Sequence, residues 1–116
     1  YSLAAPRRQH PDTGEIINST LKTIGDPIVE KTINTKTGVI SDVTIETAND
    51  QEVLDTISVM GGEDWKLWIE FLAEADVLAE GCKTTAYSYE GPKVMYPIYE
   101  GGTIGAAKRD LEKTAE

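Results

Sequence analysis

A tyrosine and a lysine near the end of the chain, Tyr99 and Lys108, are the residues best suited to proton chemistry. A nearby ammonium stabilises the phenolate form of a tyrosine, so a tyrosine beside a lysine is a better proton donor. The phenol can also hydrogen-bond an enolate oxygen as negative charge develops there. The lysine can in addition hold a ribose hydroxyl of a dinucleotide. The pair therefore predicts a site that hands a proton to a substrate anion.

The spacing of the two residues decides whether their side chains can meet. On one straight helix, nine residues turn through about 900°, which puts the two on opposite faces. Gly101 and Gly102 lie between them and can break the helix, because glycine adopts backbone conformations that other residues avoid. We therefore expect Tyr99 in a loop that enters a helix over 103–114, with its hydroxyl facing the same cavity as Lys108.

Both residues also have ordinary structural interpretations. Ile104, Lys108 and Leu111 share one face of the predicted helix, so Lys108 lies in an apolar stripe. Its stem could cover that stripe while the ammonium reaches water. Tyr99 could likewise be a half-buried aromatic residue. Because structural lysines greatly outnumber catalytic ones, the spacing alone favours these interpretations.

Composition excludes several other classes of function. The 116 residues suffice for one small domain, and 40% hydrophobic with 27% charged residues is typical of a folded protein. A net charge of −9 argues against nucleic acid as a partner. Cys82 and His10 are the single cysteine and histidine, which excludes an internal disulfide and a Cys/His zinc site. The sequence contains no apolar run of 18 residues, which is the length that would predict a membrane span. We therefore expect a cytoplasmic location.

Four segments follow from the pattern of apolar residues and turn signals. We expect residues 1–8 to end a sheet strand and residues 15–47 to form a hairpin or a three-stranded β-meander. Residues 49–80 read as two helices, the first with Asn49 and Glu52 as a capping box. Residues 83–116 read as a strand, a loop and the helix that carries Lys108. The strands at Tyr1 and Thr84 should be parallel neighbours, joined through the two helices.

The second of these helices carries an aromatic stripe that consists of Trp65, Trp68 and Phe71. Aromatic residues at helical spacing most often belong to a core. In a fragment they could instead be a docking face for other parts of a longer chain.

Three stretches of the sequence resemble the trans-2-enoyl-CoA reductases, a family that includes a class of bacterial enoyl-acyl-carrier-protein reductases. The longest runs from Tyr87 to Lys108 and contains YSYEGP, YPIY and GTIGAAK. The others are YSLAAPRR at residues 1–8 and MGGEDW at residues 60–65. The hallmark of the family is a tyrosine and a lysine separated by eight residues, which Tyr99 and Lys108 match.

The resemblance implies an activity and a set of roles. The activity is NADH-dependent reduction of the 2,3 double bond of a trans-2-enoyl thioester, carried by coenzyme A or acyl carrier protein, in fatty acid biosynthesis and lipid metabolism. Tyr99 would donate the proton and stabilise the enolate, and Lys108 would orient the nicotinamide ribose. Tyr89 matches a second active-site tyrosine that contacts the thioester carbonyl. In this family, a segment at the end of a strand lies along the dinucleotide, and it corresponds to Ser2, Leu3 and Ala4.

The implied fold is α/β, a fragment of a Rossmann-like domain of the short-chain-dehydrogenase type with the β-meander as an insertion. The family's enzymes are several times longer, and this chain holds no G-x-G-x-x-G turn for a pyrophosphate. We therefore expect this chain to be a single internal segment of a larger reductase and to be inactive alone.

The full-length parent should be a monomer, although the isolated segment could self-associate. The alternative is a non-catalytic interaction or structural fragment. Acyl carrier, chain length and NADH versus NADPH stay open.

Overall fold

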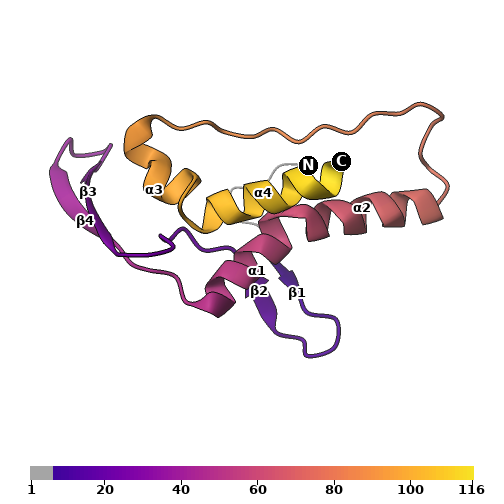
Figure 1. The fold of residues 1–116 in the computed structure, drawn as a ribbon, viewed down its shortest axis with the longest axis horizontal. Helices are drawn as coiled ribbons and strands as arrows, with labels where there is room; N and C mark the ends of the chain where they lie inside the picture. The colour runs from indigo at the N-terminus through magenta and orange to yellow at the C-terminus, as the bar shows by residue number, and fades with distance from the viewer. Residues whose placement is uncertain (1–6) are drawn as a thin grey trace.

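The computed structural model describes residues 7–116, and three packed helices form its centre (Figure 1). These helices are α1 (Asp50–Met60), α2 (Gly62–Glu74) and α4 (Thr103–Ala115). A 3-10 turn, η1 (Lys93–Met95), and a short helix, α3 (Tyr96–Tyr99), lead into α4. The mixture of helices and strands agrees with the α/β class.

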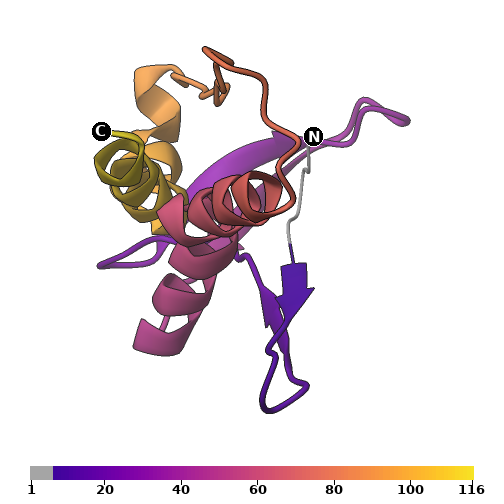
Figure 2. The same cartoon turned by 90° about the vertical axis from the view of Figure 1, so that its right-hand side faces the viewer.

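Two β-hairpins project from the helices in different directions (Figures 1 and 2). One pairs β1 (Arg7–Gln9) with β2 (Ile16–Asn18), and the other pairs β3 (Ile28–Ile33) with β4 (Ile40–Ile45). Both are antiparallel, with Arg8 opposite Ile17 and Ile33 opposite Ile40. The prediction of a three-stranded meander over 15–47 is therefore wrong, because β2 pairs with Arg7–Gln9 and a bend at residues 24–26 separates it from β3. The alternative prediction of a hairpin is confirmed by β3 and β4. No parallel sheet forms within residues 7–116.

The predicted first helix is confirmed together with its cap. The Asn49 side chain accepts a hydrogen bond from the Glu52 N–H at 2.8 Å, and the Glu52 carboxylate accepts one from the Asn49 N–H at 3.0 Å. This capping box satisfies two of the otherwise unpaired donors at the start of α1. The second helix follows directly after Gly61 and ends at Glu74 rather than near residue 80.

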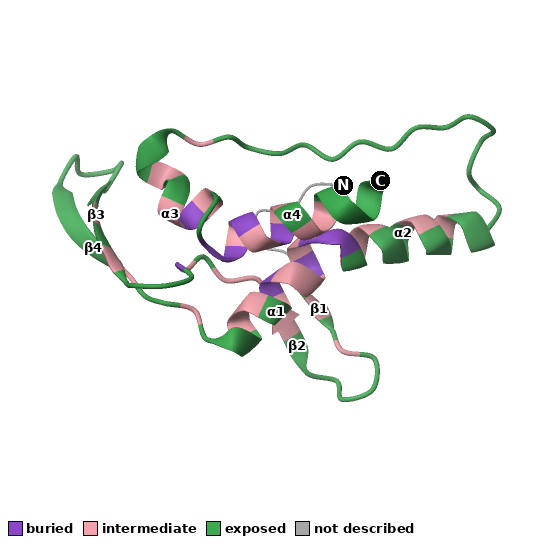
Figure 3. Cartoon of the chain, in the orientation of Figure 1, coloured by how far each residue is buried: buried purple, intermediate pink, exposed green. Residues whose placement is uncertain are grey.

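The core lies where α4 crosses the junction between α1 and α2 (Figure 3). Val59 and Ala107 are buried there, and the Gly61–Gly62 pair brings the helices close. A Cβ on Gly62 would stand 1.8 Å from the Thr114 Oγ1, so only glycine fits at this crossing. The Asp110 carboxylate accepts a hydrogen bond from the Gly62 N–H at 2.8 Å. Asp110 of α4 thus caps α2, which has no cap from its own sequence.

The aromatic stripe on α2 is only partly used in this core. Trp65 is half-buried, but Trp68 and Phe71 are exposed, Phe71 to 65%. The interpretation of this stripe as core is therefore wrong for Trp68 and Phe71.

Residues 83–91 connect α2 to α3 as an extended segment that runs along the helices (orange in Figure 1). The strand expected at 83–89 does not form, and the prediction is wrong in this respect. A strand needs a hydrogen-bonded neighbour, and the neighbour expected was residues 1–8. Arg7 and Arg8 pair with β2 instead, while Tyr1 and the rest of that stretch lie outside the described residues.

Candidate active site

Tyr99 and Lys108 lie on two helices that meet at a sharp break. Helix α3 ends at Tyr99, and α4 begins at Thr103. The Lys108 Nζ lies 5.8 Å from the centre of the Tyr99 ring, within the range in which a tyrosine face attracts an ammonium. The break predicted between the two residues is therefore confirmed, although Tyr99 ends a short helix rather than lying in a loop.

Glycines make this break tight. Gly102 begins α4 with an extended backbone, and a Cβ there would stand 2.5 Å from the Ile98 carbonyl oxygen and 2.6 Å from that of Lys22. Gly105 lies against the turn from the other side, where a Cβ would stand 2.1 Å from the Glu100 carbonyl oxygen. Such contacts are with backbone atoms, which cannot rotate away. Gly102 was found by its position between the pair, whereas Gly105 was missed because nothing local marks it.

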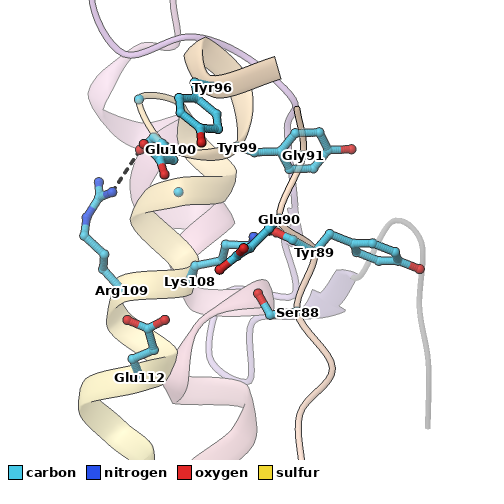
Figure 4. Close-up of a pocket in the computed structure, with 12 residues that line it drawn as sticks. Ser88, Tyr89, Glu90, Gly91, Tyr96, Tyr99, Glu100, Lys108, Arg109 and Glu112 are labelled. Carbon is cyan, nitrogen blue, oxygen red and sulfur yellow. Dashed lines mark hydrogen bonds between the residues drawn. The ribbon is translucent and has the colours of Figure 1, made fainter. Parts of the chain in front are cut away.

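Lys108 connects α4 to the extended segment 83–91. Its half-buried side chain reaches across to that segment, and its ammonium donates a hydrogen bond to the Tyr89 carbonyl oxygen (Figure 4). The interpretation of Lys108 as a lysine that simply reaches water is therefore incomplete. The Tyr89 ring points away from α4 and is 78% exposed, so Tyr89 meets Lys108 through its main chain.

A cavity of about 640 Å³ opens beside the pair, a size suited to a small ligand or to part of a larger one. The three predicted side-chain positions, Tyr89, Tyr99 and Lys108, all line it. The remaining lining residues are Ser88, Glu90, Gly91, Tyr96, Glu100, Gly101, Gly105, Arg109 and Glu112. The other predicted cofactor contacts, Ser2, Leu3 and Ala4, lie outside the described residues.

Charged residues around the cavity were missed by reasoning from the sequence. Arg109 donates a hydrogen bond of 2.9 Å to the Glu100 carbonyl oxygen, so it links α4 to the end of α3 (Figure 4). Glu112 lies one helical turn after Lys108, a spacing that could have identified it as a neighbour of the site. The lining thus combines two cations with carboxylates from Glu90, Glu100 and Glu112.

Residues 20–24 support the break from behind. The Thr103 N–H donates to the Lys22 carbonyl oxygen at 3.0 Å, and the Ile24 N–H donates to the Gly101 carbonyl oxygen at 3.2 Å. These bonds satisfy backbone groups at the start of α4, where Gly102 offers no capping side chain.

The same segment carries an ion pair with α1. The Lys22 ammonium binds the Glu52 carboxylate. This hydrogen bond, together with that from the Asn49 N–H, lowers the pKa of Glu52 below its ordinary value of 4.5. Asp64 on α2 shows the opposite effect, since burial raises its pKa and the charge of Arg8 only partly offsets this.

Residues 7–116 lack two other features that could indicate a function. No group of three or more potential metal ligands is found there. No helix in that range is long and apolar enough to cross a membrane.

Comparisons of this chain with known proteins agree on one family. A family model for the trans-2-enoyl-CoA reductase catalytic region matches residues 1–116. A trans-2-enoyl-CoA reductase [NADH] of Clostridium perfringens is 61% identical over 115 residues, which cover 99% of this chain and 30% of that protein. An enoyl-[acyl-carrier-protein] reductase [NADH] of Opitutus terrae is 54% identical over 116 residues, which cover 29% of its length. The chain thus spans about 30% of the length of these relatives.

Solved structures agree with the sequence comparison. The trans-2-enoyl-CoA reductase of Treponema denticola in complex with NAD matches with a TM-score of 0.89 and 49% identity. That of Clostridium acetobutulicum in complex with NADH matches with a TM-score of 0.90 and 43% identity. Each match covers 99% of this chain and 29% of the solved chain.

Proposed function

The chain belongs to the family of the trans-2-enoyl-CoA reductase catalytic region, and from this premise we propose that it is the proton-handling segment of a longer NADH-dependent reductase. The reductase would saturate the 2,3 double bond of trans-2-enoyl thioesters in fatty acid metabolism. The observation that carries the proposal is the Tyr99–Lys108 pair, which lines one cavity with the lysine 5.8 Å from the ring centre.

Tyr99 has the central role in this reaction. Hydride addition to Cβ leaves an enolate whose negative charge lies largely on the thioester oxygen. The Tyr99 phenol hydrogen-bonds that oxygen and helps to protonate the enolate. The Tyr99 ring lies next to Gly91 and 5.8 Å from the Lys108 ammonium, and this proximity supports the role proposed for the phenol.

Lys108 has a second role, which is to orient the cofactor. NADH, when bound, supplies the hydride. The cavity is large enough for the nicotinamide end of a dinucleotide, and the Lys108 ammonium beside it is a donor suited to a ribose hydroxyl. Ser2, Leu3 and Ala4 would lie along the dinucleotide. The Rossmann-like part that holds the pyrophosphate would lie elsewhere in the longer protein, because this sequence has no G-x-G-x-x-G turn.

Tyr89 is proposed to contact the thioester carbonyl. Its main chain already lies at the cavity through the bond to Lys108. Its exposed phenol reaches the substrate only when the ring turns toward the cavity. The acyl carrier is either coenzyme A or acyl carrier protein, since the relatives include reductases named for each.

The test is NADH oxidation by the full-length enzyme with crotonyl-CoA, followed by absorbance. We expect Tyr99→Phe to lower kcat by about 100-fold or more, because it removes only the hydroxyl. Lys108→Met should lower kcat and weaken NADH binding. Tyr87→Phe and Lys113→Met are matched controls, since both residues are exposed and neither lines the cavity. Unchanged rates in Tyr99→Phe and Lys108→Met would overturn the catalytic assignment.

The isolated 116-residue chain should not catalyse the reaction on its own. Its second candidate role is an interaction segment, favoured by the exposed apolar face of α2 at Leu67 and Phe71. A titration with NADH followed by cofactor fluorescence separates the two possibilities. Weak or absent binding is expected, and tight binding would contradict the proposal that the cofactor pocket needs further chain.

A further inference from the structure

The hydroxyl of Thr103, at the start of α4, is fully buried and makes hydrogen bonds as both donor and acceptor. Thr103 is 0% exposed, and its Oγ1 donates to the Thr20 carbonyl oxygen at 2.6 Å. The same oxygen accepts a hydrogen bond from the Lys22 N–H at 3.3 Å. Because water does not reach this position, loss of the hydroxyl would leave both backbone groups without their partner.

These bonds continue to α1 through a second buried threonine. The Thr20 N–H donates to the Thr56 Oγ1 at 3.0 Å, and the Thr56 hydroxyl donates to the Glu52 carbonyl oxygen at 2.8 Å. Thr56 is also 0% exposed. We call Thr20, Thr56 and Thr103 the threonine bridge, because together they connect α4 to α1.

The place of the bridge along the chain gives it a consequence for the site. Thr103 lies four residues after Tyr99 and five before Lys108, directly after the Gly101–Gly102 break. Two consecutive glycines leave the angle between α3 and α4 poorly determined by local preference. Thr103 donates hydrogen bonds to the carbonyl oxygens of Thr20 and Lys22, and the Ile24 N–H donates to that of Gly101, which removes that freedom.

We propose that Thr103 is a positioning residue for the enoyl reduction. Its buried hydroxyl sets where α4 begins and thereby sets the distance between the Tyr99 phenol and the Lys108 ammonium. This inference rests on the proposed function of the pair. The hydroxyl touches neither substrate nor cofactor, so it acts through Tyr99 and Lys108.

The test compares Thr103→Val with Thr56→Val in the full-length enzyme. Both variants replace a fully buried threonine of the same bridge by a residue of similar shape, but only Thr103→Val removes a hydrogen bond that a side chain of α4 makes. We expect Thr103→Val to lower kcat by about 10- to 100-fold, because small misplacements of reacting groups cost this much. The KM for crotonyl-CoA should change by less than about threefold, since no substrate contact is removed. Thr103→Ser keeps the hydroxyl and should restore most of kcat.

Thermal unfolding of each variant separates an effect on the position of α4 from a general loss of stability. The proposal holds if Thr103→Val and Thr56→Val lower the melting temperature similarly while only Thr103→Val loses kcat. It is overturned if the two lose kcat equally, or if folded Thr103→Val keeps the wild-type kcat. Should Thr103→Val fail to fold, Thr103→Cys replaces it, because a thiol fills the site and is a weak donor. Tyr99→Phe runs in the same assay: if it keeps full activity, the proposed function fails rather than the positioning role.

Discussion

Replacement of Gly105 by alanine tests how α4 is seated against the end of α3. A Cβ on Gly105 would stand 2.1 Å from the Glu100 carbonyl oxygen, 2.5 Å from its carbon and 2.7 Å from the Glu100 Cα. All three atoms belong to the backbone, so no change of side-chain rotamer relieves the contact. Residue 100 and its neighbour Tyr99 must move by about 1.3 Å or more to restore an ordinary contact distance.

The size of the effect follows from two opposed contributions. Overpacking against backbone costs up to about 3 kcal/mol, and the better helix propensity of alanine offsets about 1 kcal/mol of this. We therefore expect Gly105→Ala to lower the free energy of unfolding by about 2 kcal/mol. Activity should fall further than stability suggests, by about 100-fold in kcat, because Tyr99 itself is displaced.

The assay measures the melting temperature and kcat of the full-length enzyme with crotonyl-CoA. Gly101→Ala is the comparison, since a Cβ there would have no neighbour closer than 3.8 Å. We expect it to change the free energy of unfolding by no more than about 0.5 kcal/mol. The reasoning is refuted if Gly105→Ala is as stable and as active as the wild type, or if Gly101→Ala is equally damaging.

Two further predictions concern stability. Asp110→Ala should lower the free energy of unfolding by about 1 kcal/mol, because the Gly62 N–H at the start of α2 loses its acceptor. Thermal unfolding should show a smaller loss for Asp110→Asn. An equal loss of stability in both variants would contradict this role of the Asp110 carboxylate. Glu52→Gln should remove part of the pH dependence of stability. The pKa of Glu52 is lowered in the folded protein, so its contribution is present above pH 4.5 and is lost as the pH falls through the folded value. Urea unfolding at a series of pH values should show wild type and Glu52→Gln converging in acid, and parallel curves would contradict this.

Local features of the fold could be predicted because they depend on residues close in sequence. The two residues of the Asn49–Glu52 capping box are three positions apart, and the place of the break was indicated by the consecutive glycines Gly101 and Gly102. The pairing of Tyr99 with Lys108 then followed from the break. These predictions needed no knowledge of what lies across the molecule.

The features that could not be predicted join distant parts of the chain. The bond from Gly62 to Asp110 spans 48 positions, and the one from Thr103 to Thr20 spans 83. A threonine or an aspartate carries no local sign of such a partner.

The strand expected at 83–89 failed for a related reason. Threonine and tyrosine favour strands chiefly because they pack against neighbouring strands, and within residues 7–116 this segment has no strand beside it.

The threonine bridge also bears on the order in which the molecule assembles. The bond between Thr103 and Thr20 closes a loop of more than eighty residues, and such long-range contacts form late because closure of the loop costs conformational entropy. Helix α4 can pack against α1 and α2 only after residues 103–115 have left the ribosome. Within residues 7–116, the Tyr99–Lys108 pair is therefore expected to take its geometry only after this long loop has closed.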